Sequence, residues 1–234
     1  MKHIKSIDLF LNEGRKSWDT LSGSLVRKVF TKWVNDFNSG KKESTYIDQI
    51  EDTDRGIEFD LEASIYFKGN GFEILNSTGA DGRDEVYDEK EDEWEDQTPY
   101  IIIDFAINPK WLPGEWSNTY MHLADVMRHE IEHITQDGVS VGNYRKGKPQ
   151  EDDTELRKLI ELDFLPKYHY LILPKEVDAN LQGLRYEAKK RKIEMIDAVN
   201  NYLDTQKYLT PKTRKEVMDV WRRRATKIGG IPKF

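Results

Sequence analysis

The chain has 234 residues, a formal net charge of −7 and no cysteine. The lack of cysteine excludes disulfides and thiolate metal ligands, and the acidic balance gives no general attraction to nucleic acid or to an anionic membrane. With 37% hydrophobic and 11% aromatic residues, the chain is too apolar for a disordered protein and long enough to bury a core.

The N-terminal part predicts helices. Apolar residues recur at helical spacing over residues 5–38. Gly14 and the stretch 21–24, which contains Gly23, predict a break into two helices. The polar residues 39–56 predict a loop with a short element. Because residues 1–8 contain no apolar run, and no segment reaches the length of a membrane span, we expect a cytoplasmic protein without a membrane partner.

The next part has the period of β-strands. Apolar and charged residues alternate over residues 56–76, and Asn70-Gly71 between two apolar runs predicts a hairpin. Residues 81–96 are rich in carboxylates but lack the oxygen spacing of an EF-hand, so we expect a solvated loop or strand tip rather than a Ca²⁺ site. Residues 100–107, almost uniformly apolar, are the strongest strand of the chain.

The C-terminal half predicts helices joined by irregular segments. A helix capped by Ser117 or Asn118 should run to about Gln136. The remaining predicted elements are a connector at 108–116, a polar loop at 139–155, a short helix at 156–164, an aromatic connector at 166–173, a long helix from Pro174 to about Lys207, and a last helix from Pro211 to before Gly229. Together with the strands, these elements indicate an α+β fold with a small mixed or antiparallel sheet.

The helix ending near Gln136 carries the sequence His-Glu-x-x-His, at His129, Glu130 and His133. Two histidines four residues apart lie on one helix face, so both imidazoles can reach a single Zn²⁺ ion. The glutamate beside the first histidine is placed to take a proton from a metal-bound water. Leu123, Met127, Ile131 and Ile134 form an apolar stripe on the same helix, as expected for a helix packed on a core.

The motif and a downstream segment resemble the gluzincin type of zincin metallopeptidase, over roughly residues 100–190. In that family a later helix supplies a glutamate ligand, and the segment Leu173-Pro174-Lys175-Glu176 opens such a helix here. The pattern Glu-x-x-Ala at Glu176–Ala179 is similar to that of several bacterial and phage-encoded zincins; Asn180 departs from the thermolysin-type Glu-x-x-x-Asp. The resemblance implies that His129, His133 and Glu176 bind zinc and that Glu130 is the catalytic base.

Other third ligands remain open: His169 ranks second to Glu176, and Glu161 and Asp163 follow. A metzincin is excluded, because Gln136 and Val139 stand where that class has glycine and its third histidine. Asp125 and Asp178 are candidates for orienting a ligand histidine. His122 lies about 10 Å along the helix from His129 and is expected to pack rather than to bind the ion.

Three further features are less specific. Side chains suited to stabilising an oxyanion are Tyr144, Arg145, Tyr168, His169, Tyr170 and Arg185. In zincins the strand before the motif helix is usually an edge strand that pairs with substrate, but the apolarity of residues 100–107 also fits a central strand. Basic residues crowd the last helix at Lys212, Arg214, Lys215, Arg222, Arg223, Arg224 and Lys227, but acidic residues interrupt them, so nucleic acid is an unlikely partner.

The sequence therefore predicts one zincin-like metallopeptidase domain over residues 1–234, with an N-terminal helical segment (about 1–40) and a C-terminal helical extension (about 174–234). Its expected activity is hydrolysis of a peptide or protein substrate with Zn²⁺ as cofactor. The alternative is a non-catalytic zincin-fold structural or interaction protein, for example a phage component, that keeps the metal site. A virion-associated location would fit a phage-encoded chain.

Overall fold

The chain divides into two compact units. The computed structural model describes residues 7–52, 57–80, 85–88, 93–96, 98–136, 153–228 and 230–234. One unit spans residues 23–149, and the other combines residues 1–22 with residues 150–234. We refer to them as the sheet unit and the helical unit. The fold is mixed, with helices and a four-stranded mixed sheet, consistent with the predicted α+β class.

Helix α1 (Ile7–Asn38) is a single α-helix that contributes residues to both units. The predicted break into two helices is wrong. A glycine inside a helix costs only about 1 kcal/mol, and each buried leucine or valine contributes more than that. Leu21, Leu25 and Val26, which flank Gly23, are all buried, so packing holds the helix together across this stretch.

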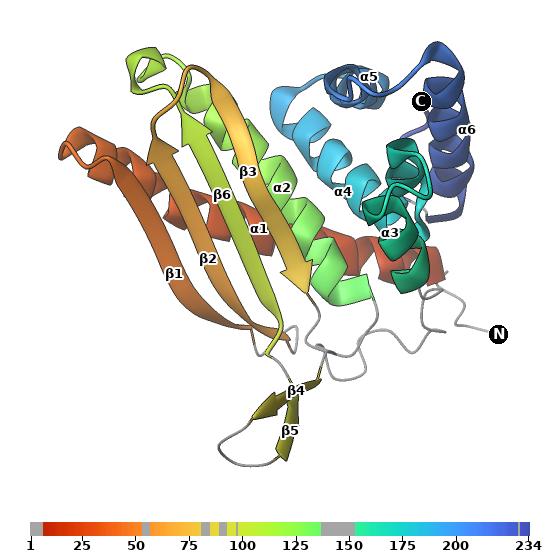
Figure 1. Cartoon of the computed structure of the whole chain (residues 1–234), viewed down its shortest axis with the longest axis horizontal. Coiled ribbons are helices and arrows are strands. Elements are labelled where there is room, and N and C mark those ends of the chain that lie inside the picture. Colours follow the sequence, from red (N-terminus) through yellow and green to blue (C-terminus); the bar gives the residue numbers. More distant parts are fainter. Residues whose placement is uncertain are drawn as a thin grey trace. The chain divides into compact units, whose positions relative to one another are not determined.

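The sheet of the sheet unit has the order β1-β2-β6-β3 (Figure 1). Strand β1 (Glu43–Asp52) pairs antiparallel with β2 (Ile57–Phe67), and β2 pairs parallel with β6 (Tyr100–Ile107). Strand β3 (Phe72–Ala80) pairs antiparallel with β6. Within residues 39–56, predicted as a loop with a short element, the structure shows the 10-residue strand β1. This edge strand has mostly polar side chains and gains its regular structure by pairing with β2.

The predicted hairpin is also wrong in its pairing. Strands β2 and β3 follow each other across the predicted turn, but β6 lies between them. The bounds of β6 match the prediction, and its apolar side chains explain its central place, where neighbours cover both edges. The edge strand beside β6 is therefore β3, and of the two alternatives left open for residues 100–107, edge or centre, the structure shows the central one.

Two helices pack on one face of this sheet: the second half of α1 and α2 (Trp116–Gln136), seen behind the strands in Figure 1. Trp33 of α1 is fully buried, donates its indole N–H to the Ala63 carbonyl at 3.2 Å and packs on Phe105. Phe30 packs edge-on against Trp116 and Tyr120 and so joins the two helices.

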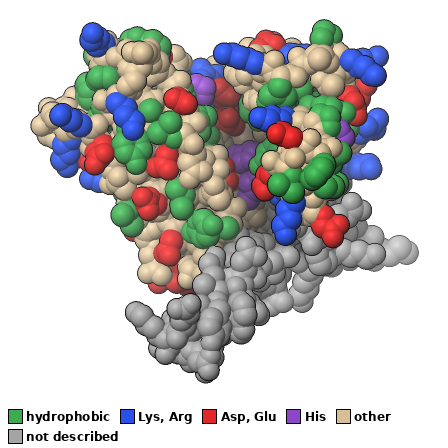
Figure 2. Space-filling view, in the orientation of Figure 1, with side chains coloured by type: hydrophobic (Ala, Val, Ile, Leu, Met, Phe, Trp, Pro, Cys, Tyr) green, Lys and Arg blue, Asp and Glu red, His purple; other side chains and the backbone are tan. Residues whose placement is uncertain are grey.

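The other face of the sheet is polar. Glu58, Asp60 and Glu62 alternate with buried residues along β2 and are exposed. Figure 2 shows this face, with acidic side chains in red among other types.

A short 3₁₀ helix, η1 (Pro109–Trp111), lies in the connector that leads to α2. Part of the acidic tract, for which a solvated loop or strand tip was predicted, forms a small antiparallel pair, β4 (Glu85–Asp88) and β5 (Glu93–Asp96). The rest of that tract lies outside the described residues.

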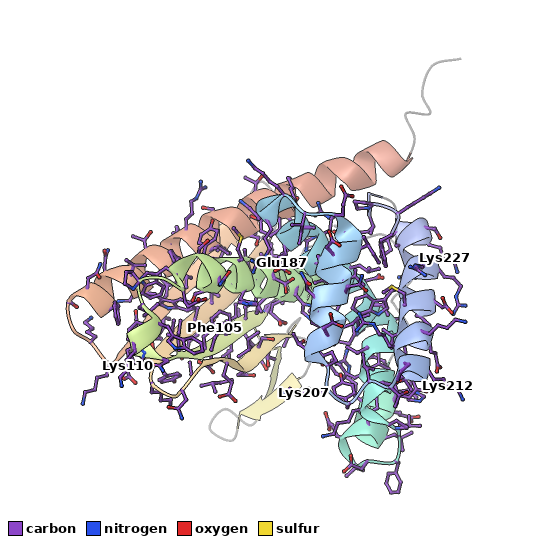
Figure 3. The ribbon with its side chains drawn as sticks, turned by 90° about the horizontal axis from the view of Figure 1, so that it is seen from above. Phe105, Lys110, Glu187, Lys207, Lys212 and Lys227 are labelled. Atoms are coloured by element: carbon purple, nitrogen blue, oxygen red, sulfur yellow. The ribbon has the colours of Figure 1, made fainter. Side chains whose placement is uncertain are left out.

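The helical unit contains α3 (Thr154–Glu161), η2 (Lys167–Ile172), α4 (Pro174–Arg191), α5 (Met195–Thr205) and α6 (Pro211–Ile228). Its core surrounds Trp221 of α6, which is fully buried and donates its indole N–H to the Leu171 carbonyl at 2.7 Å. Figure 3 shows α6 with Lys212 and Lys227 near its two ends. None of the described helices is both long and apolar enough to span a membrane.

The long helix predicted from Pro174 to about Lys207 is wrong, because it ends at Arg191 and α5 starts after a short turn. Lys192 caps α4 in the left-handed conformation, with φ of 58° and ψ of 42°, and its N–H bonds to the Ala188 carbonyl. No glycine or proline near Lys192 indicates this break in the sequence.

Candidate metal centre

Helix α2 places the two histidines of the motif one turn apart. The predicted apolar stripe is confirmed: Leu123, Met127 and Ile131 are fully buried. His129 and His133 lie at the edge of this stripe and are half-buried. Their Nε2 atoms are 3.0 Å apart, and their ring centroids are 4.7 Å apart at 72°. The helix thus brings two imidazole nitrogens to one point.

This spacing fits a tetrahedral metal ion. Zinc binds histidine nitrogen at about 2.0–2.1 Å, which puts two nitrogens of a tetrahedral site about 3.3 Å apart. The 3.0 Å between the Nε2 atoms of His129 and His133 is close to that value. The two rings therefore need only a small adjustment to bind one ion.

Glu130 is buried, with 2% of its surface exposed. It lies against the edge strand β3 at Gly79. A Cβ atom added to Gly79 would be 2.8 Å from the Glu130 carbonyl oxygen and 3.1 Å from its carboxylate Oε2. Only glycine lets β3 approach the helix this closely at Glu130. No local pattern around Gly79 predicted this role.

The other glutamate of the motif has a different environment. Glu132 accepts a hydrogen bond from the Arg128 guanidinium at 3.0 Å, and both side chains are buried. This buried ion pair joins residues one helical turn apart and holds the Glu132 carboxylate in place.

Glu176 belongs to the helical unit, in the first turn of α4, and 1% of its surface is exposed. Its Oε1 accepts a hydrogen bond from Nη2 of Arg157 at 2.9 Å. Arg157 lies on α3, and it also binds Asp153 and the Tyr170 hydroxyl. The structure thus provides a buried carboxylate whose position is set by a cation from a neighbouring helix.

The pKa shifts in this cluster follow from burial and charge. Burial raises the pKa of Tyr170 well above its ordinary value, and the Glu176 carboxylate raises it further, while Arg157 opposes both. Burial alone would lower the pKa of Arg157. The hydrogen bond to Asp153 and the charge of Glu176 outweigh burial, so the pKa of Arg157 is raised and its guanidinium stays charged.

The other candidate ligands have different surroundings. His169 lies in η2 with its ring 4.4 Å from that of Tyr168, and Glu161 and Asp163 are exposed. Asp178, a predicted orienter, forms a two-pronged ion pair with Arg224 of α6, with both distances 2.6 Å. That pair raises the pKa of Arg224 and ties α4 to α6.

Two other predictions concern packing and charge stabilisation. His122 stacks on Phe72 of β3, with ring centroids 4.7 Å apart at 20°, which confirms that it is a packing histidine. Among the oxyanion candidates, Arg185 pairs with Asp19 and with Gln182. Tyr144 and Arg145 lie outside the described residues.

The basic residues of α6 are partly paired within the helical unit. Arg214 binds Asp204 at 2.7 Å and Asn200 at 3.1 Å, and Arg222 donates to the Phe234 carbonyl. Other cations of α6 are exposed, and Figure 2 shows blue side chains along the edge where Figure 1 places this helix. The partners of Arg214 lie on α5, that of Arg222 lies at the C-terminal end, and that of Arg224 is Asp178 of α4.

Comparison of the chain with protein families, with curated proteins and with solved structures finds no match. The gluzincin resemblance therefore depends on the motif residues alone. The cluster around Arg157 was missed by the sequence reasoning. Its only local signal is the four-residue spacing between Asp153 and Arg157, which is typical of a helical ion pair.

Proposed function

We propose that the protein is a zinc-dependent peptidase. His129 and His133 of the sheet unit and Glu176 of the helical unit bind the metal ion, and Glu130 acts as general base and then as general acid. The observation that carries this proposal is the pair of Nε2 atoms 3.0 Å apart within a His-Glu-x-x-His helix. The proposal requires both units to contribute donors to one ion.

The donor set supports zinc. Among the described residues, His129, His133 and Glu176 each offer one ligand atom of a type that a metal ion binds. Two imidazoles and a carboxylate are a common set for catalytic zinc and leave a fourth position for water. A bound zinc ion would polarise the scissile carbonyl and lower the pKa of the water that attacks it.

Glu130 has the chemistry for the proton transfers. Glu130 directly follows His129 in the helix, so in a His-Glu-x-x-His motif its side chain is expected beside the face that carries the two histidines. It accepts the proton of the attacking water and later delivers it to the leaving amine. Its burial against β3 limits the orientations of its side chain.

Strand β3 offers a place for the substrate backbone. It is an edge strand, α2 packs beside it, and Gly79 brings it next to Glu130. An extended peptide that pairs with β3 would lie close to the general base, because strand addition uses the backbone groups of an open edge. The substrate in this proposal is a peptide segment in extended conformation.

The test compares wild type with Glu130→Gln, which keeps the size of the side chain and removes its basicity. We expect both proteins to bind one zinc ion, and the variant to lose at least about 100-fold in cleavage of a peptide library. Glu62→Gln, on the exposed face of the sheet, is the matched control and should cleave as wild type does.

Two results would contradict the peptidase proposal. One is a zinc-loaded wild type that cleaves no peptide, which would favour the non-catalytic zincin-fold alternative. The other is a Glu130→Gln variant that cleaves as fast as wild type, because the proton transfers would then belong to another group.

A further inference from the structure

The carboxylate of Glu176 has a partner whose own position is fixed. Arg157 donates Nη2–H to Oε1 of Glu176 at 2.9 Å. Only 2% of the Glu176 side chain is exposed, so this bond is shielded from solvent on the glutamate side. A charge-assisted bond in such surroundings is stronger and more directional than one at the surface.

Arg157 also forms a two-pronged ion pair with Asp153. Its Nε donates to Oδ1 of Asp153 at 3.0 Å and its Nη2 to Oδ2 at 3.1 Å. Asp153 is 4% exposed and lies one helical turn away. A two-pronged pair fixes the plane of the guanidinium, which lysine could not do, because an ammonium group has no fork.

A third contact completes the cluster. Nη1 of Arg157 donates to the Tyr170 hydroxyl at 3.3 Å, and the guanidinium lies 5.3 Å from the centre of the Tyr170 ring. Arg157 is thus held by α3 and by η2, and it presents one N–H group to Glu176 on α4. Each of the three nitrogens of the Arg157 guanidinium donates at least one of these hydrogen bonds.

We propose that Arg157 is a positioning residue for the third metal ligand. It binds one oxygen of Glu176 and so sets the orientation in which the carboxylate offers its other oxygen to the ion. Asp153 and Tyr170 keep Arg157 in place for that purpose. This inference rests on the proposed function, because it assumes that Glu176 binds the metal.

Two roles of the Arg157–Glu176 ion pair, stabilising the fold or positioning the ligand, predict different effects of losing Arg157. If Arg157 only stabilised the helical unit, its loss would lower the stability of the protein and leave the zinc affinity of the folded fraction unchanged. If Arg157 positions Glu176, the zinc affinity falls even where the protein is fully folded. Outer partners of metal ligands typically change metal affinity by about 10–100-fold.

The experiment measures zinc dissociation constants of the full chain by competition with a chromophoric chelator, at a temperature where every variant is folded by circular dichroism. We expect Arg157→Met to bind zinc about 10–100-fold more weakly than wild type. Arg157→Lys keeps the charge without the fork, so its affinity should lie between the two. Arg214→Met is the matched control, since Arg214 is ion-paired in the same unit and equally exposed.

Asp153→Asn is the second variant, for the case that Arg157→Met does not fold. It loosens the anchor of Arg157 without removing the cation, and it should also weaken zinc binding. The inference is wrong if wild type binds zinc and the folded variants at 153 and 157 bind it as tightly. A wild type that binds no zinc instead contradicts the proposed function itself, and the inference falls with it.

Discussion

At Gly79 the edge strand β3 comes into close contact with the motif helix α2. A Cβ atom there would lie 2.8 Å from the Glu130 carbonyl oxygen and 3.2 Å from its Cα. Both are backbone atoms of a buried helix, so they cannot move away as the end of a flexible side chain could. The close approach is therefore a requirement of the fold at this point.

We predict that Gly79→Ala lowers the free energy of unfolding by about 1–3 kcal/mol, the usual cost of an added group in a packed interior. Urea unfolding followed by circular dichroism measures it. Gly71→Ala is the control, because the nearest atom to its added Cβ, on Trp111, is at an ordinary 3.6 Å. Equal effects of the two substitutions would mean that the contact at Glu130 is not tight.

The motif residues could be predicted from the local sequence, whereas the contact between Arg157 and Glu176 could not. His129, Glu130 and His133 are adjacent in a motif with a known mechanism, so their spacing alone predicted that the imidazoles converge. The contact between Arg157 and Glu176 joins residues 19 positions apart on different helices. No local pattern encodes such a contact, because it depends on how α3 and α4 pack.

At the scale of elements, Asp36 joins the end of α1 to β1. Its carboxylate accepts a hydrogen bond from Ser44 at 2.6 Å and forms ion pairs with Lys41 at 2.7 Å and Lys32 at 3.0 Å. The bond from Lys41, followed by those from Ser44 and Lys32, lowers the pKa of Asp36 far below its ordinary value of 3.8.

This shift predicts a dependence of stability on acid. A carboxyl group with a lowered pKa in the folded protein contributes stability above its unfolded pKa, and this contribution is lost as the pH falls below about 4. We expect Asp36→Asn to be less stable than wild type at pH 7, with the difference shrinking as the pH falls toward 2. Urea unfolding at several pH values measures this, and a difference that stayed constant with pH would contradict it.

Lys41→Met tests the same ion pair by removing the partner of Asp36. It removes the largest cause of the low pKa of Asp36, so that pKa should rise toward its ordinary value. Because Lys41 and Lys32 are more than a third exposed, added salt should weaken the effect.

Elements with a strong pattern of their own were predicted well. Strand β6 has the predicted bounds, and α2 ends at Gln136 as expected, because an uninterrupted apolar run and a clear helical stripe leave little ambiguity. Strand β1 was missed, since its sequence has few apolar residues and its structure depends on β2. The end of α4 at Lys192 was missed because a lysine in the left-handed conformation has no sequence signal.

At the scale of the whole molecule, the sequence could suggest the proposed zinc ligands but not the division into units. The sheet unit contains the motif helix, and the helical unit contains Glu176. Residues 1–22 belong with the C-terminal helices, an association that no reading along the chain could show. The single domain predicted from the sequence stays a prediction, as does the zincin fold.

The central claim is that one zinc ion is bound by His129, His133 and Glu176. The most direct measurement is the zinc content of purified protein after dialysis, for wild type and for the alanine variant of each ligand. His122→Ala, on the same helix but stacked on Phe72, is the matched control. We predict about one zinc ion per chain in wild type and in the control, and a loss of at least about 100-fold in affinity for each ligand variant. A wild type without zinc, or a Glu176→Ala variant that keeps full affinity while His169→Ala loses it, would contradict this account.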